Sequence, residues 1–133
     1  MIQRGDQVLE IFLEETADRL DAIESGLLHL ESCGEDCDPE IINSIFRDAH
    51  SVKAGSNLLK LKTIEDLAHK LENVLEMIRK KQIAPSEIIV TACLESVDKL
   101  RELIENIERS DTISTRLHTH MLEVAVQKTL QGE

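Results

Sequence analysis

The sequence predicts an all-α fold, an antiparallel up-down four-helix bundle with an additional C-terminal fifth helix. Apolar residues recur every three or four positions in successive segments, the spacing that places them on one face of a helix. Short connections separate the segments, so consecutive helices are expected to pack as antiparallel neighbours. Hydrophobic residues make up 41% of the 133 residues, which is enough for one core. We expect a single domain over residues 1–133, with the bundle at about 6–110 and the C-terminal helix at about 114–130.

The first helix is predicted over residues 7–30. Asp6 precedes it and is a suitable N-cap, because an aspartate side chain accepts hydrogen bonds from the free amides of the first turn. The polar, glycine-containing stretch 32–37 follows the helix. The apolar face consists of Leu9, Leu13, Leu20, Ile23, Leu27 and Leu30.

The second helix is predicted to begin at Pro39 and to run to about Asn57. Asp38 is the expected N-cap, and proline suits the first helical position because its missing amide hydrogen is not needed there. The apolar face consists of Ile42, Ile45, Phe46, Ala49 and Val52.

The third helix is predicted over residues 63–79, with Thr63 as its N-cap, because residues 63–66 resemble a capping box with aspartate in place of glutamate. The cations at 79–81 suit a helix C-terminus. The apolar face consists of Ile64, Leu67, Leu71, Val74, Leu75 and Ile78.

The fourth helix is predicted to open at residues 85–87 and to reach Ile107, and a fifth segment covers about 114–130. Cys93 falls on the apolar face of the fourth helix and is expected to be a small buried hydrophobic residue. The expected core residues of the fifth segment are Leu117, Met121, Val124, Ala125 and Leu130.

Composition argues against several classes of partner. The net charge of -11 disfavours nucleic acid and anionic membrane surfaces, which would repel the chain. With two phenylalanines as the only large aromatic residues, base-stacking surfaces are not expected. The longest apolar run, 88–94, is too short to span a bilayer, and the N-terminus lacks the pattern of a signal peptide. We expect a cytoplasmic protein with no nucleic-acid and no membrane partner.

The three cysteines are expected to be reduced, because an aliphatic core of this size needs no disulfide framework. Cys33 and Cys37, with His29, could be interpreted as a cluster of metal ligands. No second ligand pair follows at the spacing of a zinc site, so we expect no metal site there.

The second helix carries the first candidate for a reactive side chain, His50. His50 lies at the flank of its apolar face, at the expected boundary between core and solvent, with Arg47 and Lys53 three residues away on either side. Gly55 is unfavourable in the interior of a helix, which indicates a need for space. These residues together predict an accessible imidazole with positive charge beside it.

The third helix supplies a complement to His50. Its polar face flanks the apolar one and could face the second helix, since a short connection makes the two antiparallel neighbours. A hydrogen bond from Nδ1 of His50 to Glu72 would leave the Nε2 lone pair directed outward and would make the ring a better nucleophile. This polar face consists of Glu65, His69, Glu72, Glu76 and Arg79.

The two segments together resemble a known family. Residues 46–56, FRDAHSVKAGS, followed by residues 67–75, LAHKLENVL, are similar to the histidine phosphotransfer (HPt) domain at the N-terminus of CheA-type chemotaxis histidine kinases. The His-x-x-Lys-small-Gly element, the later His-x-x-Glu and the 19-residue gap between the two histidines carry the resemblance, which covers essentially the whole chain.

The resemblance implies a role for each matching position. It implies that His50 accepts a phosphoryl group at Nε2, that Glu72 orients the ring through Nδ1, and that Lys53 and His69 surround the phosphoryl group. The small residues Ala54 and Gly55 correspond to the place where a partner approaches; the family usually has glycine where this chain has Ala54.

The resemblance also implies the partners. These are the ATP-binding domain of a histidine kinase, which gives the phosphoryl group, and a response-regulator receiver domain, whose aspartate takes it. No nucleotide-binding motif is present in the sequence, so ATP and Mg²⁺ are expected to belong to the partner domains and the chain alone is expected to have no ATPase or kinase activity.

Two other functions remain open on the sequence alone. A non-catalytic helical adaptor would explain the bundle and its charge, but not Gly55 or an accessible His50. A carboxylate-bridged metal bundle needs Glu-x-x-His on two helices, whereas the chain has His69-x-x-Glu72 on one.

Overall fold

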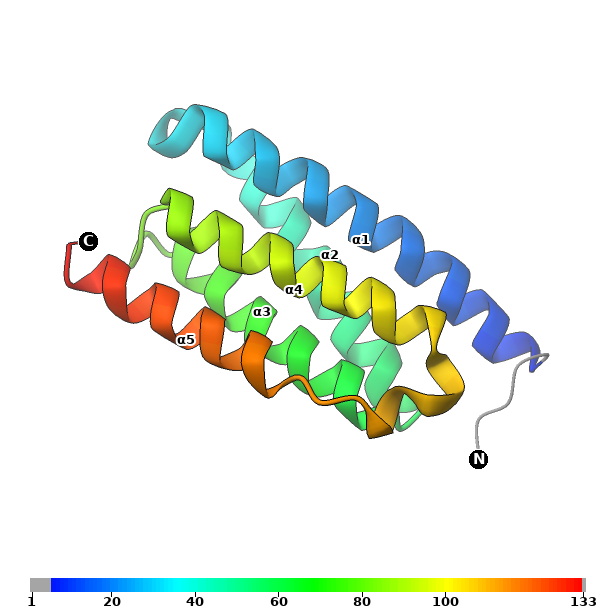
Figure 1. Ribbon diagram of the computed structural model, residues 1–133. Helices are drawn as coiled ribbons and strands as arrows, with labels where there is room; N and C mark the ends of the chain where they lie inside the picture. Colours follow the sequence, from blue (N-terminus) through cyan, green and yellow to red (C-terminus); the bar gives the residue numbers. More distant parts are fainter. Residues whose placement is uncertain (1–5, 133) are drawn as a thin grey trace.

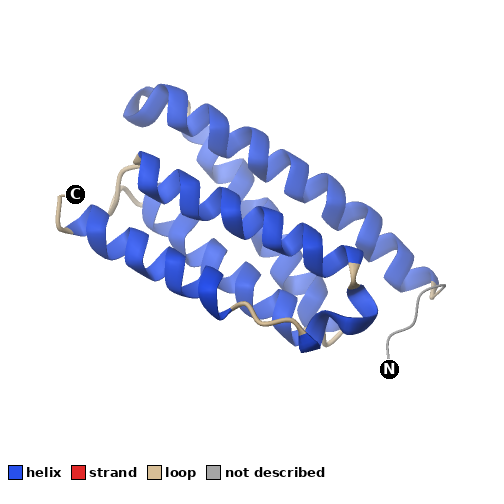
Figure 2. Cartoon of the chain, in the orientation of Figure 1, coloured by secondary structure: helices blue, strands red, loops and turns tan. Residues whose placement is uncertain are grey.

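The computed structural model of the chain describes residues 6–132 and is helical throughout, which confirms the predicted all-α class. Figure 2 shows helices joined by short loops, with no strand in the described part. The elements are α1 (Gln7–Cys33), the 3₁₀ helix η1 (Gly34–Asp36), α2 (Pro39–Leu58), α3 (Lys62–Arg79), α4 (Glu87–Glu105), the 3₁₀ helix η2 (Ile107–Thr112) and α5 (Arg116–Leu130).

The first four α-helices form the bundle, and α5 packs outside it. In Figure 1 these helices run up and down beside one another, and α5 lies along α4. Helix α1 packs against α2 and α4, while α5 packs against α3 and α4. The most extensive packing between helices joins α2 to α3. These two helices carry His50 and Glu72, respectively.

Two of the three predicted N-caps, Asp6 and Asp38, are confirmed, and the helix predicted to open at residues 85–87 also has a capping side chain, Ser86. Asp6 accepts hydrogen bonds from the amides of Val8 and Leu9, Asp38 accepts one from Glu40, and the hydroxyl of Ser86 accepts one from Ile89. These side chains fix where α1, α2 and α4 begin.

The prediction that Thr63 caps the third helix is wrong. Helix α3 begins one residue earlier, at Lys62, and its N-cap position, Leu61, has no capping side chain. The Thr63 amide instead donates to Oδ1 of Asp111 in η2, at 3.2 Å. The Asp111 carboxylate, 48 residues away in sequence, thus accepts the hydrogen bond of an amide for which the neighbouring residues supply no capping side chain.

The core is aliphatic and contains most residues of the predicted apolar faces of the first four helices, although Leu13 and Phe46 are only partly buried. Cys93 is fully buried, as predicted, and burial raises the pKa of its thiol to about 12. The fifth helix departs from its predicted face: Leu117 and Leu130 are exposed, and Leu122 and Ala125 are its buried residues. Because α5 covers only the outside of α3 and α4, a narrow strip of its surface is enclosed.

The structure corrects the prediction for two of the cysteines. Cys33 and Cys37 form a disulfide across η1, with their Cα atoms 5.1 Å apart. Their spacing of four residues at the end of a helix brings the two side chains together, which composition alone does not reveal. The disulfide also removes both thiolates from any metal site.

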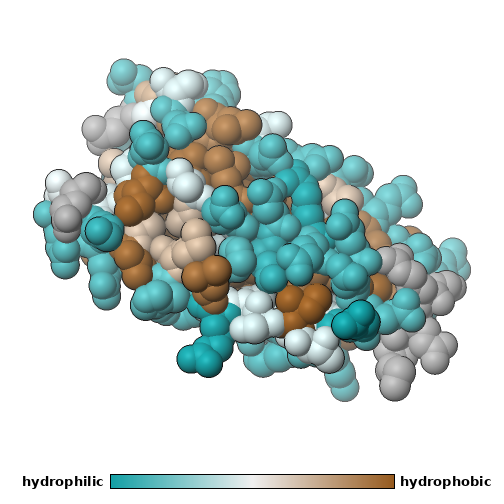
Figure 3. Space-filling model, viewed as in Figure 1, coloured by the Kyte–Doolittle hydropathy of each residue, from teal (hydrophilic) through white to brown (hydrophobic). Residues whose placement is uncertain are grey.

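The surface is mostly hydrophilic on the face that carries α1, α4 and α5. Figure 3 shows this face, with apolar residues gathered toward the end where α1 finishes and α4 begins. Within residues 6–132, none of the helices combines the length and apolar character that crossing a membrane requires.

Candidate functional site

His50 stands on the surface of α2, near the middle of the helix, on the side that faces α3. Its side chain is 56% exposed, whereas Ala49, the residue before it, is buried in the core. The predicted position at the flank of the apolar face is therefore the observed one. Buried residues such as Ala49 pack α2 against the core, while the His50 imidazole remains accessible to solvent.

Glu72 of α3 holds the imidazole. Its Oε2 lies 2.5 Å from Nδ1 of His50, a short hydrogen bond between residues 22 apart in sequence. An ionised carboxylate only accepts hydrogen bonds, so Nδ1 carries the proton of the neutral ring. The lone pair is then on Nε2, the nitrogen that points away from Glu72.

Lys53 completes the surroundings of Glu72. Its ammonium donates to Oε1 at 2.7 Å, so the two carboxylate oxygens have separate partners from α2. The Glu72 side chain is only 8% exposed. Burial by itself raises the pKa of this carboxyl, but the hydrogen bonds from Lys53 and His50 outweigh it and the pKa is lowered below its ordinary value of 4.5.

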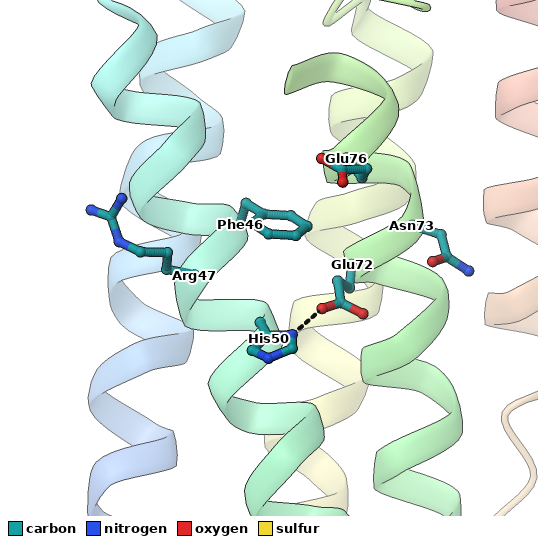
Figure 4. A pocket seen from close by; sticks show the side chains of 6 residues that line it. All are labelled: Phe46, Arg47, His50, Glu72, Asn73 and Glu76. Atoms are coloured by element: carbon teal, nitrogen blue, oxygen red, sulfur yellow. Dashed lines mark hydrogen bonds and ion pairs between the residues drawn. The ribbon is translucent and has the colours of Figure 1, made fainter. Parts of the chain in front are cut away.

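A shallow cavity of about 310 Å³ opens beside the imidazole. Phe46 and His50 of α2 line it together with Glu72, Asn73 and Glu76 of α3. In Figure 4, Phe46 and His50 project toward α3, whereas the Asn73 side chain extends away from α2. Arg47 lines one edge, but its guanidinium extends away from the histidine and pairs with Glu40 at 2.7 Å. Of the two cations expected beside His50, Lys53 joins the cluster and Arg47 does not.

The remaining predicted site residues lie around this cluster. His69 is exposed on α3, one turn before Glu72, and no hydrogen bond or ion pair joins it to another residue of the described part. Ala54 is exposed on α2, one turn after His50. Their predicted roles, near the phosphoryl group and in partner access, stay predictions.

Gly55 has a packing reason that the sequence did not reveal. A Cβ atom at this position would lie 3.1 Å from two ring carbons of Phe12 in α1. The absent side chain therefore lets α1 and α2 approach each other. Whether Gly55 also serves partner access stays a prediction.

Sequence reasoning missed part of the site. The apolar spacing predicts that Phe46 is a core residue, yet it is only partly buried and lines the cavity. Its position one turn before His50 is the signal that could have identified it. Asn73 lines the cavity as well, and no helical pattern singles it out.

The described residues contain no cluster of side chains that would support a metal-dependent role. Between residues 6 and 132, no group of three or more His, Cys, Asp or Glu side chains is placed to hold a metal ion. Glu72, the buried carboxylate, is already engaged by Lys53 and His50. The arrangement instead suits an imidazole that acts as a nucleophile at Nε2.

The chain is similar to regions of a chemotaxis protein and of a sensor histidine kinase. The chain is 35% identical over 98 residues to the chemotaxis protein CheA of Rhizobium meliloti, covering 74% of the chain and 13% of that protein. It is 30% identical over 122 residues to the sensor histidine kinase CheAY of Helicobacter pylori, covering 92% of the chain and 15% of that protein. The chain thus spans a small fraction of the length of these curated relatives.

A solved structure shares the fold. The crystal structure of the phosphorylated P1 domain of CheA3 in complex with CheY6 from R. sphaeroides matches with a TM-score of 0.79 and 23% identity, covering 93% of this chain and 98% of that one. The family model described as the Hpt domain matches residues 7–110. That range runs from the start of α1 into η2 and includes His50, Lys53 and Glu72, so the chain belongs to the Hpt domain family.

Proposed function

We propose that this chain is a phosphotransfer module in which His50 accepts a phosphoryl group at Nε2 from ATP, through a kinase catalytic domain, and passes it to an aspartate of a receiver domain. The observation that carries the proposal is the pairing of an exposed imidazole with a buried, ionised Glu72 on Nδ1. This pairing leaves one nitrogen, Nε2, as the nucleophile.

The acceptance step uses the Glu72 contact directly. The Nε2 lone pair forms the bond to the γ-phosphorus while the bond from that phosphorus to the bridging oxygen breaks, and ADP leaves with those electrons. Positive charge then develops on the ring, whose Nδ1 proton points at the carboxylate. Because Glu72 is ionised before the reaction, it stabilises this charge without rearranging.

The second step reverses the bonding at Nε2. An aspartate oxygen of the receiver attacks the phosphorus, the P–N bond breaks, and its electron pair returns to Nε2. The ring is again neutral with its proton on Nδ1, facing Glu72. The chain is thereby returned to its starting state and acts as a carrier.

The relatives support the choice of partners. The two compared above are named as a chemotaxis protein and a sensor histidine kinase, and the similar solved domain is phosphorylated and in complex with CheY6. In our proposal the kinase domain brings ATP and Mg²⁺, the receiver brings the aspartate, and the exchange takes place in the cytoplasm.

Phosphoramidate, a small donor that needs no kinase, tests acceptance on the 133-residue chain. We expect one phosphoryl group, labile in acid and stable in base, in the wild type and none in His50→Gln. His120→Gln is the matched control, because His120 is also an exposed helical histidine with a glutamate neighbour, Glu123. Thermal melting should be nearly the same for all three proteins, since exposed residues add little to the core.

Transfer is tested by mixing the purified phosphorylated chain with a chemotaxis receiver domain and following both proteins on phosphate-affinity gels. The label should leave the chain and appear on the receiver. A label that persists in His50→Gln would show that another residue is the acceptor, and a label that never leaves the wild-type chain would refute the carrier role.

A further inference from the structure

The imidazole of His50 is one end of a continuous stack of side chains. The Phe46 ring lies one turn earlier on α2, with its centroid 6.4 Å from that of His50 and the two ring planes 22° apart. The separation falls within the range of interacting aromatic pairs, and the small angle between the planes makes the pair stacked rather than edge-to-face. In Figure 4 the Phe46 ring projects from α2 toward α3, beside His50.

The stack continues to α3 through Arg79. The guanidinium carbon of Arg79 lies 4.8 Å from the centroid of Phe46, within the distance of a cation–π contact. Arg79 is held in turn by Glu76, whose Oε1 is 2.6 Å from both its Nε and its Nη2. Phe46 is therefore fixed by a residue on the opposite helix.

One hydrogen bond does not define the orientation of a largely exposed imidazole. The contact between Nδ1 and Glu72 fixes one edge of the ring, but the torsion at χ2 of a histidine is broad. The ring can rock about that contact unless something lies along its plane. Phe46 lies nearly parallel to the ring, so its face is placed to restrict rotation of the imidazole in that direction.

Resting on the proposed function of His50, we infer that Phe46 is a positioning residue for phosphoryl transfer, held in place by Arg79. Glu72 selects which nitrogen is free, and Phe46 with Arg79 fixes the direction in which Nε2 points. Transfer through a loose transition state depends mainly on the alignment of the attacking nitrogen with the leaving group. Loss of the stack should slow transfer while the nucleophile itself is intact.

Three variants separate this role from simple packing. Phe46→Leu keeps an apolar side chain that can pack against the core but has no flat face, and Phe46→Tyr keeps the face. Arg79→Ala removes the cation over Phe46. The matched control is Lys80→Ala, which also removes a cation beside Glu76 (3.9 Å) but one for which no contact with the ring is present in the described structure.

Two measurements are made on each variant of the 133-residue chain. The first is the order parameter of the His50 Cε1–H bond from ¹³C relaxation, which reports fast motion of the ring. The second is the rate of phosphorylation by phosphoramidate. We expect Phe46→Leu and Arg79→Ala to lower both, with a rate loss of about three- to tenfold, and Phe46→Tyr and Lys80→Ala to match the wild type.

Several results would overturn the inference. A slower rate with unchanged ring order in Phe46→Leu would mean that Phe46 acts only as packing. A looser ring with an undiminished rate would mean that its orientation does not limit transfer. Equal losses of ring order and phosphorylation rate in Arg79→Ala and Lys80→Ala would mean that Arg79 acts only through its charge and not through its contact with Phe46. Failure of the wild type to accept phosphate at all would instead contradict the proposed function, so the two failures are distinguishable.

Discussion

Glu72 and His50 share a hydrogen bond of 2.5 Å between two helices, although 22 residues separate them in sequence. The carboxylate is nearly buried and the imidazole is more than half exposed. The contact therefore links a fixed, desolvated anion to an accessible imidazole, the proposed nucleophile. Its strength depends on the carboxylate remaining ionised, which Lys53 favours from the other oxygen.

Replacing Glu72 with alanine should remove the preference of His50 for a single tautomer. In the wild type, the neutral ring should carry its proton on Nδ1, and in Glu72→Ala the two tautomers should mix. Phosphorylation by a small donor should slow by about 10²-fold or less, because orientation and charge stabilisation are lost while the nucleophile remains. Nitrogen-resolved NMR of the ring reads the tautomer. A wild-type ring protonated mainly on Nε2 would contradict the proposed role of Glu72.

The lowered pKa of Glu72 predicts how stability changes with pH. Because the pKa is lower in the folded protein than its ordinary value of 4.5, the carboxylate stabilises the fold above that value, and the contribution disappears as the pH falls through the folded-state pKa. Glu72→Gln should therefore be less stable than the wild type at pH 7 by about 1–2 kcal/mol, and the gap should narrow toward pH 3.

Urea unfolding at a series of pH values measures that gap. Glu123→Gln is the control, because Glu123 is exposed and pairs with Lys70 at the surface. Asp48 changes the pH dependence of stability in the opposite direction, because its pKa is raised in the folded protein. Burial raises this pKa, and the nearby Arg19 offsets the effect only in part. The difference between Glu72→Gln and the wild type removes the Asp48 contribution. A gap that is constant from pH 7 to pH 3 would be inconsistent with the lowered pKa.

Gly55 and Ala54 should differ sharply in their response to added bulk. Gly55→Val inserts a side chain against Phe12 and should destabilise the fold by about 1–3 kcal/mol, with much of the loss recovered when Phe12→Ala is added. Ala54→Leu adds bulk at an exposed position and should leave stability nearly unchanged. It should slow transfer to a receiver domain but not phosphorylation by a small donor. Equal slowing of both reactions would argue against a role for Ala54 in partner access.

The disulfide between Cys33 and Cys37 should contribute modestly to stability and little to transfer. It closes a short loop, so the Cys33→Ser, Cys37→Ser double variant should lose about 1–2 kcal/mol and melt at a lower temperature. Its phosphorylation rate should match that of the wild type, because the bond lies before α2 begins. Mass spectrometry after alkylation without reductant checks the bond itself: two modified thiols from this pair would show that it is absent.

Much of the fold was predictable because its signals are local. Apolar spacing lies within the helices that it defines, and capping side chains such as Asp6 and Asp38 directly precede theirs. The start of α3 was not predictable in this way, because the amide of Thr63 is satisfied by Asp111 from 48 residues away. The exposure of Leu117 likewise depends on how α5 rests on the bundle.

The same division holds for the site. The pairing of His50 with Glu72 was predicted, since a short connection makes α2 and α3 antiparallel neighbours. The placement of Arg47 was not, because a helix position gives the direction of the Cβ atom but not the partner that a long side chain selects, here Glu40. The stack of Phe46 under Arg79 also joins two helices, and spacing within either one does not show it.

The positions of His50 and Glu72 near the middle of α2 and α3 have a consequence for hydrogen exchange and local opening. Helix ends fray at little free-energy cost, whereas central turns of packed helices open only in larger unfolding events. Both residues lie about two turns or more from either end of their helices. Fraying at the helix ends therefore leaves the backbone under the imidazole folded, so a partner meets the histidine on a helix turn that is already formed.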